Sequence, residues 1–321
     1  MPDRESRWEM RGPHRVVDAE IDRWTVVDGL PVPVYCQFPD SSRAQALPVV
    51  VLSHGLGGDH RSYGLLGAHL ASNGYTVLHP QFLDSIRYVQ ANGAKDGGEA
   101  NTDEIRDIVR PMLFDPLHWQ SRADRARAVI GSLANQAHLP VRLEPENVTA
   151  LGHSYGAFTS QLLIGVQLFT SPDTIGVLRE PAVNCAVLLS PQGSGDRGLT
   201  DHSWESVTTP LLVITSTQDR GPHGEGLAWR RECYDRSRSG FKHLVVARDT
   251  DHFLGGIHLS EDGPDLFDGR FTPDPQVRRA VSALTLAFID AVHGDGEASA
   301  WLASRPLIDI AEHEHWTGSR D

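Results

Sequence analysis

A serine flanked by glycines is the first feature of the chain that could do chemistry. Residues 152–156 read Gly-His-Ser-Tyr-Gly, the G-x-S-x-G pattern, between a strand-like run at 148–151 and a helical stretch that begins at Ala157. In that setting the pattern predicts a nucleophile elbow, a sharp strand-to-helix turn that holds the Oγ atom of Ser154 above a sheet. Glycines lack a Cβ atom, so strand and helix can approach closely at the bend. We favour this interpretation over an ordinary tight turn.

A serine hydroxyl is a weak nucleophile at neutral pH and needs a base. In folds built around such an elbow, the acid and then the histidine follow the serine along the chain. His252 stands in a loop after the last strand-like run, and we predict that it is the base. We interpret His153, beside the serine, as support for the elbow. The other histidines late in the chain are His243, His258, His293, His313 and His315.

The acid that orients the histidine should end the preceding strand. Asp219 follows the apolar run at 209–217, while Asp249 and Asp251 lie close to His252 in the sequence. Adjacent side chains seldom point at each other, so we favour Asp219 over these two competitors.

A tetrahedral intermediate also needs backbone N–H donors. The residue after the nucleophile, Tyr155, supplies one, and we predict that Leu56 supplies the second from the glycine-rich segment 54–58. A phosphate-binding turn is the alternative for this segment. It is disfavoured because neither G-x-G-x-x-G nor the P-loop lysine is present.

No metal or cofactor is expected from the sequence. The late His-Glu-His-Trp segment, His313–Trp316, lacks the spacing of a zinc motif, and we predict a surface turn there. The three cysteines are widely spaced and indicate neither a disulfide framework nor a zinc site. Cys36 and Cys185 lie in strand-like runs, which is typical of small buried side chains.

Short apolar runs alternate with helical patterns along the chain, which predicts an α/β fold with a mostly parallel, doubly wound sheet. The runs lie at 47–55, 74–80, 147–154, 181–191, 209–217 and 241–249. The clearest helix is expected over 275–291, with Asp274 as its N-cap. Near the N-terminus, Asp28-Gly29 separates two β-rich arms and predicts an antiparallel hairpin at the edge of the sheet.

We interpret residues 1–321 as a single domain. Segments 84–118 and 218–240 fit the alternation less well, and because they leave the carboxyl ends of strands, we expect them to form the rim of a pocket. The pocket residues predicted from the same positions are Phe82, Gln192, Trp229 and Phe253.

The charge and hydrophobicity of the chain disfavour several classes of partner and location. The net charge is −13 with no cluster of Lys and Arg, so a nucleic-acid partner is disfavoured. No apolar run reaches the roughly 18 residues of a membrane span. The first 15 residues lack the apolar segment of a secretory signal, which favours a cytoplasmic location. The oligomeric state is not predicted.

Six segments together resemble the bacterial serine hydrolases labelled predicted dienelactone hydrolases, which are related to platelet-activating-factor acetylhydrolases. They read VVVLSHGLGG, LASNGYTVLHP, GHSYG, LLSPQG, SWESVTTPLLVITSTQDRG and DHF, and the resemblance covers residues 45–258. It implies an α/β-hydrolase fold, cofactor-free ester hydrolysis, and the same triad and oxyanion donors. Dienelactone hydrolases proper use a cysteine nucleophile, whereas this chain has Ser154, so the label does not predict dienelactone turnover.

The resulting hypothesis is a carboxylic ester hydrolase that acts on a small-molecule ester through a covalent acyl-enzyme. A thioesterase or amidase could use the same triad. A hydrolase-fold binding protein without catalysis is an alternative of a different class, and an intact triad argues against it.

Overall fold

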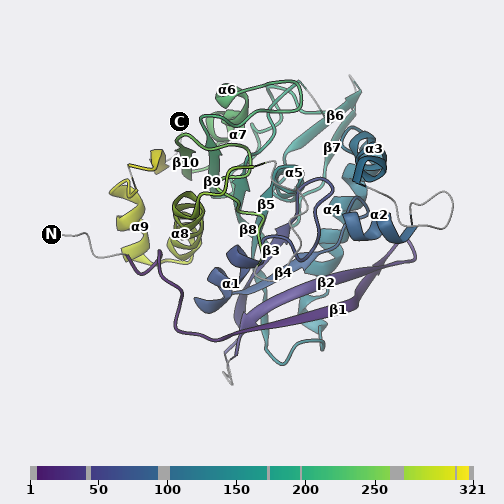
Figure 1. The fold of residues 1–321 in the computed structure, drawn as a ribbon, viewed down its shortest axis with the longest axis horizontal. Coiled ribbons are helices and arrows are strands. Elements are labelled where there is room, and N and C mark those ends of the chain that lie inside the picture. The colour runs from purple at the N-terminus through teal and green to yellow at the C-terminus, as the bar shows by residue number, and fades with distance from the viewer. Residues whose placement is uncertain are drawn as a thin grey trace.

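One large sheet runs through the molecule, with helices packed on both faces (Figure 1). The computed structural model of the chain describes residues 6–40, 45–92, 102–171, 174–195, 197–260, 271–307 and 309–317. Within these ranges the strands of the large sheet are β1 (Val16–Val27), β2 (Leu30–Pro39), β3 (Leu47–Ser53), β4 (Thr76–Pro80), β5 (Leu143–His153), β8 (Val183–Leu189), β9 (Leu211–Ser216), β10 (Phe241–Ala247) and β11 (Ala311–Thr317).

The strand order creates a switch point in the middle of the sheet. The order is β1-β2-β4-β3-β5-β8-β9-β10-β11, and the strands from β4 to β10 are parallel. After β3 the chain crosses to β4 on one side, and it later returns to β5 on the other side. The loops that follow β3 and β5 therefore diverge, and a crevice opens between them. The predicted elbow and the glycine-rich segment leave the sheet at this point.

The N-terminal hairpin is confirmed. β1 and β2 pair antiparallel at the edge of the sheet. The turn residues Asp28 and Gly29 have φ values of 51° and 77°, and two successive left-handed residues are what a tight two-residue hairpin turn requires. With this hairpin beside the parallel strands, the molecule has the predicted α/β-hydrolase fold.

The helix that the sequence predicted most clearly, over 275–291, is present in the structure. In the described ranges they are α1 (Gly64–Ser72), α2 (Ile86–Asn92), α3 (Thr102–Met112), α4 (Pro116–Gly131), α5 (Tyr155–Leu163), α6 (Leu227–Arg230), α7 (Glu232–Arg236), α8 (Pro275–Val292) and α9 (Gly296–Ala303), with a 3₁₀ turn at Leu133–Asn135. The predicted cap of α8 is present, since the Asp274 side chain accepts hydrogen bonds from the N–H groups of Gln276 and Val277.

Apolar side chains on the two faces of the sheet form two core layers. In β3, Val49 and Val51 join the layer that contains α4 and α5, whereas Val50 and Leu52 join the layer that contains α1 and α8. The central strands are therefore buried on both sides, which explains their continuous apolar runs. Cys36 and Cys185 are fully buried in β2 and β8, as predicted.

The prediction of a surface turn at 313–316 was wrong. These residues belong to β11, which pairs antiparallel with β10 at the second edge of the sheet. His313 is buried there, and its Nε2 atom lies 2.8 Å from Nδ1 of His243. Histidines on the inward face alternate with exposed Glu312 and Glu314, so the segment follows the period of a half-buried strand. The short hairpin of β6 (Gln167–Ser171) and β7 (Thr174–Val177) was not predicted either.

The buried histidine pair predicts a loss of stability in mild acid. Burial, and after it the neighbouring His313, lowers the pKa of His243 to about 3, and burial lowers the pKa of His313 to about 4. In the unfolded chain a histidine has a pKa of about 6.5, so the unfolded state takes up more protons below that pH. The contribution of this pair to the free energy of unfolding should therefore be constant above pH 7 and fall as the pH drops from about 6.5 toward 4.

Urea unfolding at pH 8, 7, 6 and 5 measures this dependence. The double variant His243→Leu/His313→Leu removes two of the groups that titrate on unfolding, so its stability should fall less steeply, by up to about 1.4 kcal/mol per pH unit per histidine. Equal slopes for the variant and the wild-type protein would contradict the prediction.

Candidate functional site

Ser154 stands at a strained turn between β5 and α5. Its φ and ψ angles are 56° and −121°, a backbone conformation that a non-glycine residue rarely adopts and that costs about 1–3 kcal/mol. The flanking glycines make the turn possible. A Cβ atom on Gly152 would lie 2.1 Å from the carbonyl oxygen of Gly156, and one on Gly156 would lie 1.9 Å from the carbonyl oxygen of Ser53. The sequence therefore brings the ends of β5, α5 and β3 together at one serine.

The structure joins His252 to Asp219, as the sequence order suggested. Nδ1 of His252 lies 2.8 Å from Oδ1 of Asp219, which follows β9 and is completely buried. An ionised carboxylate only accepts hydrogen bonds, so Nδ1 carries the proton and donates it to Asp219. The second ring nitrogen, Nε2, is then left as the acceptor. About a quarter of the His252 side chain remains exposed.

The two competing aspartates make other contacts. The carboxylate of Asp251 accepts hydrogen bonds from the N–H groups of Phe253, at 2.8 Å, and Thr272, at 3.1 Å. Asp249 is exposed and has a left-handed backbone, with φ at 51°. Asp251 thus shapes the histidine loop, and within the described part of the chain Asp219 is the carboxylate that contacts the His252 ring.

A buried arginine, missed by sequence reasoning, shares the Asp219 carboxylate. Nη2 of Arg230 lies 2.9 Å from Oδ1 of Asp219, and the hydroxyl of Thr215 donates to Oδ2 at 2.9 Å. Nη1 of Arg230 also donates to the carbonyl oxygens of Ser190 and Pro191, at 3.0 and 2.9 Å. The arginine therefore ties the acid to the loop after β8.

These contacts keep Asp219 ionised. Burial by itself raises the pKa of the carboxyl group, but the charge and hydrogen bond of His252, together with the Arg230 guanidinium, outweigh burial and hold the pKa well below its usual range. No local sequence signal marks Arg230, because a lone arginine in a polar segment is most often a surface residue.

His153 links the histidine loop to the glycine-rich segment. The N–H group of Gly55 donates to the Tyr63 hydroxyl at 3.2 Å, and this hydroxyl donates to Nδ1 of His153 at 2.8 Å. Nε2 of His153 then donates to the backbone carbonyl oxygen of His252, also at 2.8 Å. Burial holds the pKa of His153 well below its usual value, so the ring stays neutral in this chain of hydrogen bonds. His153 therefore contacts the backbone of His252 directly and the glycine-rich segment through Tyr63.

Among the described residues, neither predicted oxyanion donor uses its backbone N–H group in a hydrogen bond. Tyr155 is the first residue of α5, where an amide has no acceptor within the helix. The Leu56 N–H group makes no hydrogen bond to the described residues. Leu56 and Ser154 also line the same cavity.

A buried ion pair holds the segment that carries Leu56. Nη1 of Arg122 lies 2.6 Å from Oδ1 of Asp84, and both side chains are about 3% exposed. The other oxygen of Asp84 accepts from the N–H group of Gly57 at 3.3 Å, while Nη2 of Arg122 donates to the carbonyl oxygen of His54. Leu56 lies between these two anchored residues. The Arg122 guanidinium also lies 4.3 Å from the centre of the Tyr155 ring, so one arginine contacts Tyr155 as well as the segment that carries Leu56.

A cavity of about 220 Å³ brings the predicted groups together. Its lining contains Ser154, His252, Leu56 and Gln192. The remaining lining residues come from the two predicted rim segments and the loop after β8, and they are Leu113, Arg197, Arg220, Gly221, Pro222 and Arg230. Residues 93–101, inside the first rim segment, lie outside the described residues.

The other predicted pocket residues are not part of this lining. Phe82 is fully buried beneath the Arg122 guanidinium, 4.0 Å from it. Trp229 is buried and its Nε1 atom donates to the carbonyl oxygen of Ser194. The ring of Phe253 packs between the rings of His252 and Phe271, with centroids 5.6 and 5.7 Å away.

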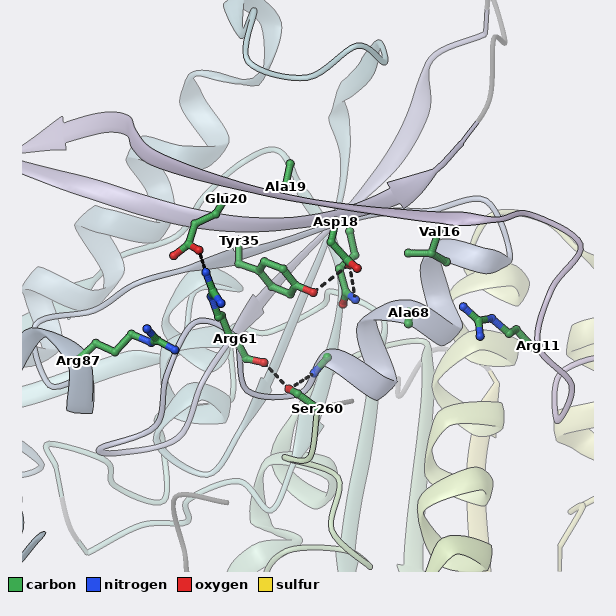
Figure 2. Close-up of a pocket in the computed structure, with 12 residues that line it drawn as sticks. Arg11, Val16, Asp18, Ala19, Glu20, Tyr35, Arg61, Ala68, Arg87 and Ser260 are labelled. Carbon is green, nitrogen blue, oxygen red and sulfur yellow. Dashed lines mark hydrogen bonds and ion pairs between the residues drawn. The ribbon is translucent and has the colours of Figure 1, made fainter. Parts of the chain in front are cut away.

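A larger cavity of about 440 Å³ lies between the N-terminal hairpin and α1 (Figure 2). Asp18 and Glu20 face it together with Arg61, and the Arg61 guanidinium pairs with Glu20. The Tyr35 hydroxyl donates to Asp18 at 2.9 Å. None of the residues that line this cavity lines the cavity at Ser154, so the two are separate.

Within the described residues, no group of three or more His, Cys, Asp or Glu side chains is arranged to hold a metal ion. None of the helices in that part of the chain combines the length and apolar character that crossing a bilayer requires.

A model of a known protein family matches part of the chain. The family model of platelet-activating factor acetylhydrolase, isoform II, matches residues 19–104. The match supports a relation to that family. It covers less than a third of the chain and includes Leu56, but it ends before Ser154. A search of curated proteins finds no significant match.

The Arg122–Asp84 pair predicts a large stability difference between two aspartate variants. Asp84→Ala leaves a buried guanidinium without its carboxylate, and the free energy of unfolding should fall by about 3–5 kcal/mol. Asp40→Ala is the matched control, because its partner Arg15 is 83% exposed and such pairs contribute about 0–1 kcal/mol. Urea unfolding at pH 7.5 compares the two. Equal midpoints for the two variants would contradict the prediction.

Proposed function

We propose that this chain is a serine esterase that cleaves carboxylic esters through a covalent acyl-enzyme. The observation that carries the proposal is the buried Asp219–His252 hydrogen bond at the cavity lined by the strained Ser154. A serine in that backbone conformation, a histidine whose Nε2 atom makes no hydrogen bond to the described residues, and an acid with a lowered pKa are the three parts of nucleophilic acyl transfer.

In the first half-reaction, the Oγ atom of Ser154 attacks the ester carbonyl carbon while Nε2 of His252 takes the hydroxyl proton. The carbonyl oxygen becomes an oxyanion, which accepts hydrogen bonds from the N–H groups of Leu56 and Tyr155. When the intermediate collapses, His252 gives the proton to the departing alcohol. Asp219 stabilises the positively charged imidazole between these steps.

In the second half-reaction, His252 takes a proton from water, and the resulting hydroxide attacks the acyl-enzyme. Collapse of the second intermediate releases the acid, and the proton returns to the Oγ atom of Ser154. The cycle leaves the enzyme unchanged and needs no redox partner.

The family match supports hydrolysis as the reaction class, since the matched family is named for acetyl hydrolysis of platelet-activating factor. We propose that the substrate here is a small-molecule ester, because the cavity at Ser154 measures only about 220 Å³. Dienelactones are not proposed as substrates. We further propose that residues 1–321 form one catalytic domain in which segments 84–118 and 218–240 form the pocket rim, since both contribute lining residues.

Replacement of the nucleophile is the first test. Ser154→Ala removes the atom that forms the acyl-enzyme, so kcat for p-nitrophenyl acetate should fall by roughly 10⁴-fold or more. The thermal midpoint should stay close to that of the wild-type protein, because alanine meets the same backbone strain as serine. Activity within tenfold of wild type would contradict the proposal, as would a wild-type protein that cleaves no ester.

The choice of acid is tested by two matched variants. Asp219→Asn removes the charge that fixes the histidine tautomer, and kcat should fall by roughly 10²–10⁴-fold. Asp251→Asn changes a loop contact and should stay within about tenfold. Both are measured at saturating ester, with circular dichroism as the folding control. A severe loss in Asp251→Asn beside near-normal Asp219→Asn would reverse the assignment and leave Ser154 and His252 in place.

A further inference from the structure

The backbone of Gln192 is fixed beside the nucleophile elbow. The N–H group of Ser154 donates to the carbonyl oxygen of the last residue of β8 at 2.9 Å. In the loop after this strand, Arg230 donates to the carbonyl oxygen of Pro191 at 2.9 Å. Nε2 of Gln161, in α5, donates to the carbonyl oxygen of Gln192 at 3.2 Å. These bonds hold Gln192 in a fixed position relative to the helix that follows the serine.

The side-chain amide of Gln192 makes no hydrogen bond to the described residues. The residue is 3% exposed and lines the cavity at Ser154. Its Oε1 atom is closed off from solvent and lacks a partner within the described part of the chain. Nε2 has no acceptor there either, but it is not closed off from solvent. Because Gln192 lines the cavity, Nε2 can donate to a molecule that is bound beside Ser154.

The neighbouring Gln161 shows how a structural glutamine differs. Its side chain is fully buried, Nε2 donates to the carbonyl oxygen of Gln192, and Oε1 accepts from Nε1 of Trp204 at 2.6 Å. Both ends of that amide are therefore used within the protein. Buried polar groups in native proteins are nearly always hydrogen-bonded, and an unpaired one needs a separate explanation. Ligand binding provides that explanation for Gln192.

An ester that enters the cavity displaces the water that reaches Nε2. A donor that loses its water and gains no other partner weakens binding, because an unpaired buried polar group is costly. An ester with an oxygen atom at this position keeps the donor paired, and the oxygen of an uncharged hydroxyl or carbonyl group suits a neutral amide. Sites that hydrogen-bond a substrate group discriminate strongly against analogues that lack this group.

We propose that Gln192 determines substrate specificity, and that the substrate is an ester with a second oxygen function, a hydroxyl or carbonyl group, whose oxygen accepts a hydrogen bond from Nε2 of Gln192 while the ester carbonyl lies at Ser154. This inference rests on the esterase function proposed above and specifies its substrate class. The cavity volume of about 220 Å³ restricts the second oxygen to a position a few bonds from the ester.

Matched esters with and without a second oxygen test this substrate class. On the acyl side, p-nitrophenyl 3-hydroxybutyrate and p-nitrophenyl 3-oxobutyrate are compared with p-nitrophenyl butyrate. On the alcohol side, 4-(hydroxymethyl)phenyl acetate is compared with 4-ethylphenyl acetate. The readout is the ratio of kcat/KM for the oxygenated ester to kcat/KM for the plain ester, measured for the wild-type protein and for Gln192→Met. Comparing the two proteins cancels the intrinsic reactivity of each ester.

In at least one pair, Gln192→Met should lower this ratio by roughly 5- to 50-fold, because the variant cannot donate to the second oxygen. Gln120→Met, at an exposed glutamine of α4 that does not line the cavity, is the matched control and should leave the ratio unchanged. A fall of less than threefold in every pair would overturn the inference. Failure of the wild-type protein to cleave any of these esters, oxygenated or plain, would instead count against the esterase function itself.

Thermal unfolding separates this role from a purely structural one. Gln192→Met removes an amide that makes no hydrogen bond to the described residues, so its thermal midpoint should equal or exceed that of the wild-type protein. Gln161→Met removes an amide that is bonded at both ends, and its midpoint should fall. A fall for Gln192→Met as large as that for Gln161→Met would contradict the assignment of Gln192 to substrate binding.

Discussion

The backbone at Ser154 is the constraint around which the site is organised. A φ of 56° is unfavourable for serine, and it persists because β5 and α5 are both locked into the sheet and its core layers. Gly152 and Gly156 allow the two elements to approach closely, and the second glycine also brings the end of β3 against the turn. This single bend sets the serine beside the glycine-rich segment 54–58, at the point where the strand order reverses.

Two buried arginines, Arg122 and Arg230, fix loops that lie outside the apolar core. Loops at the carboxyl ends of strands present backbone carbonyl oxygens, which need partners when they are buried. Arg122 and Arg230 supply those partners, and each is balanced by one buried aspartate. Buried ion pairs add little net stability, but they fix geometry because breaking one is costly. In this site the first pair holds the predicted oxyanion segment and the second holds the acid, while His153 connects the two regions through neutral hydrogen bonds.

The sequence was informative where one local signal determines the structure. The parallel strands, the Asp28-Gly29 hairpin and the cap of α8 follow from apolar runs, turn chemistry and capping residues, all of which act over a few positions. β11 was missed because its inward face carries histidines, which are polar in the sequence but buried against β10. Arg122 and Arg230 were missed for a related reason, since a buried arginine is recognisable only once its partner, 38 or 11 residues away, is beside it. Phe82 does follow the end of β4, whereas Trp229 lies in α6, and the directions of both side chains depend on contacts that no local pattern encodes.

The central claim is that Ser154 is the nucleophile, and covalent capture tests it most directly. The wild-type protein is incubated with a fluorophosphonate and analysed by intact-mass and peptide mass spectrometry. The account predicts one phosphonyl adduct per chain, located on Ser154, together with loss of esterase activity in proportion to labelling. An adduct on a different residue that tracks the loss of activity, or full activity with no adduct at all, would contradict it.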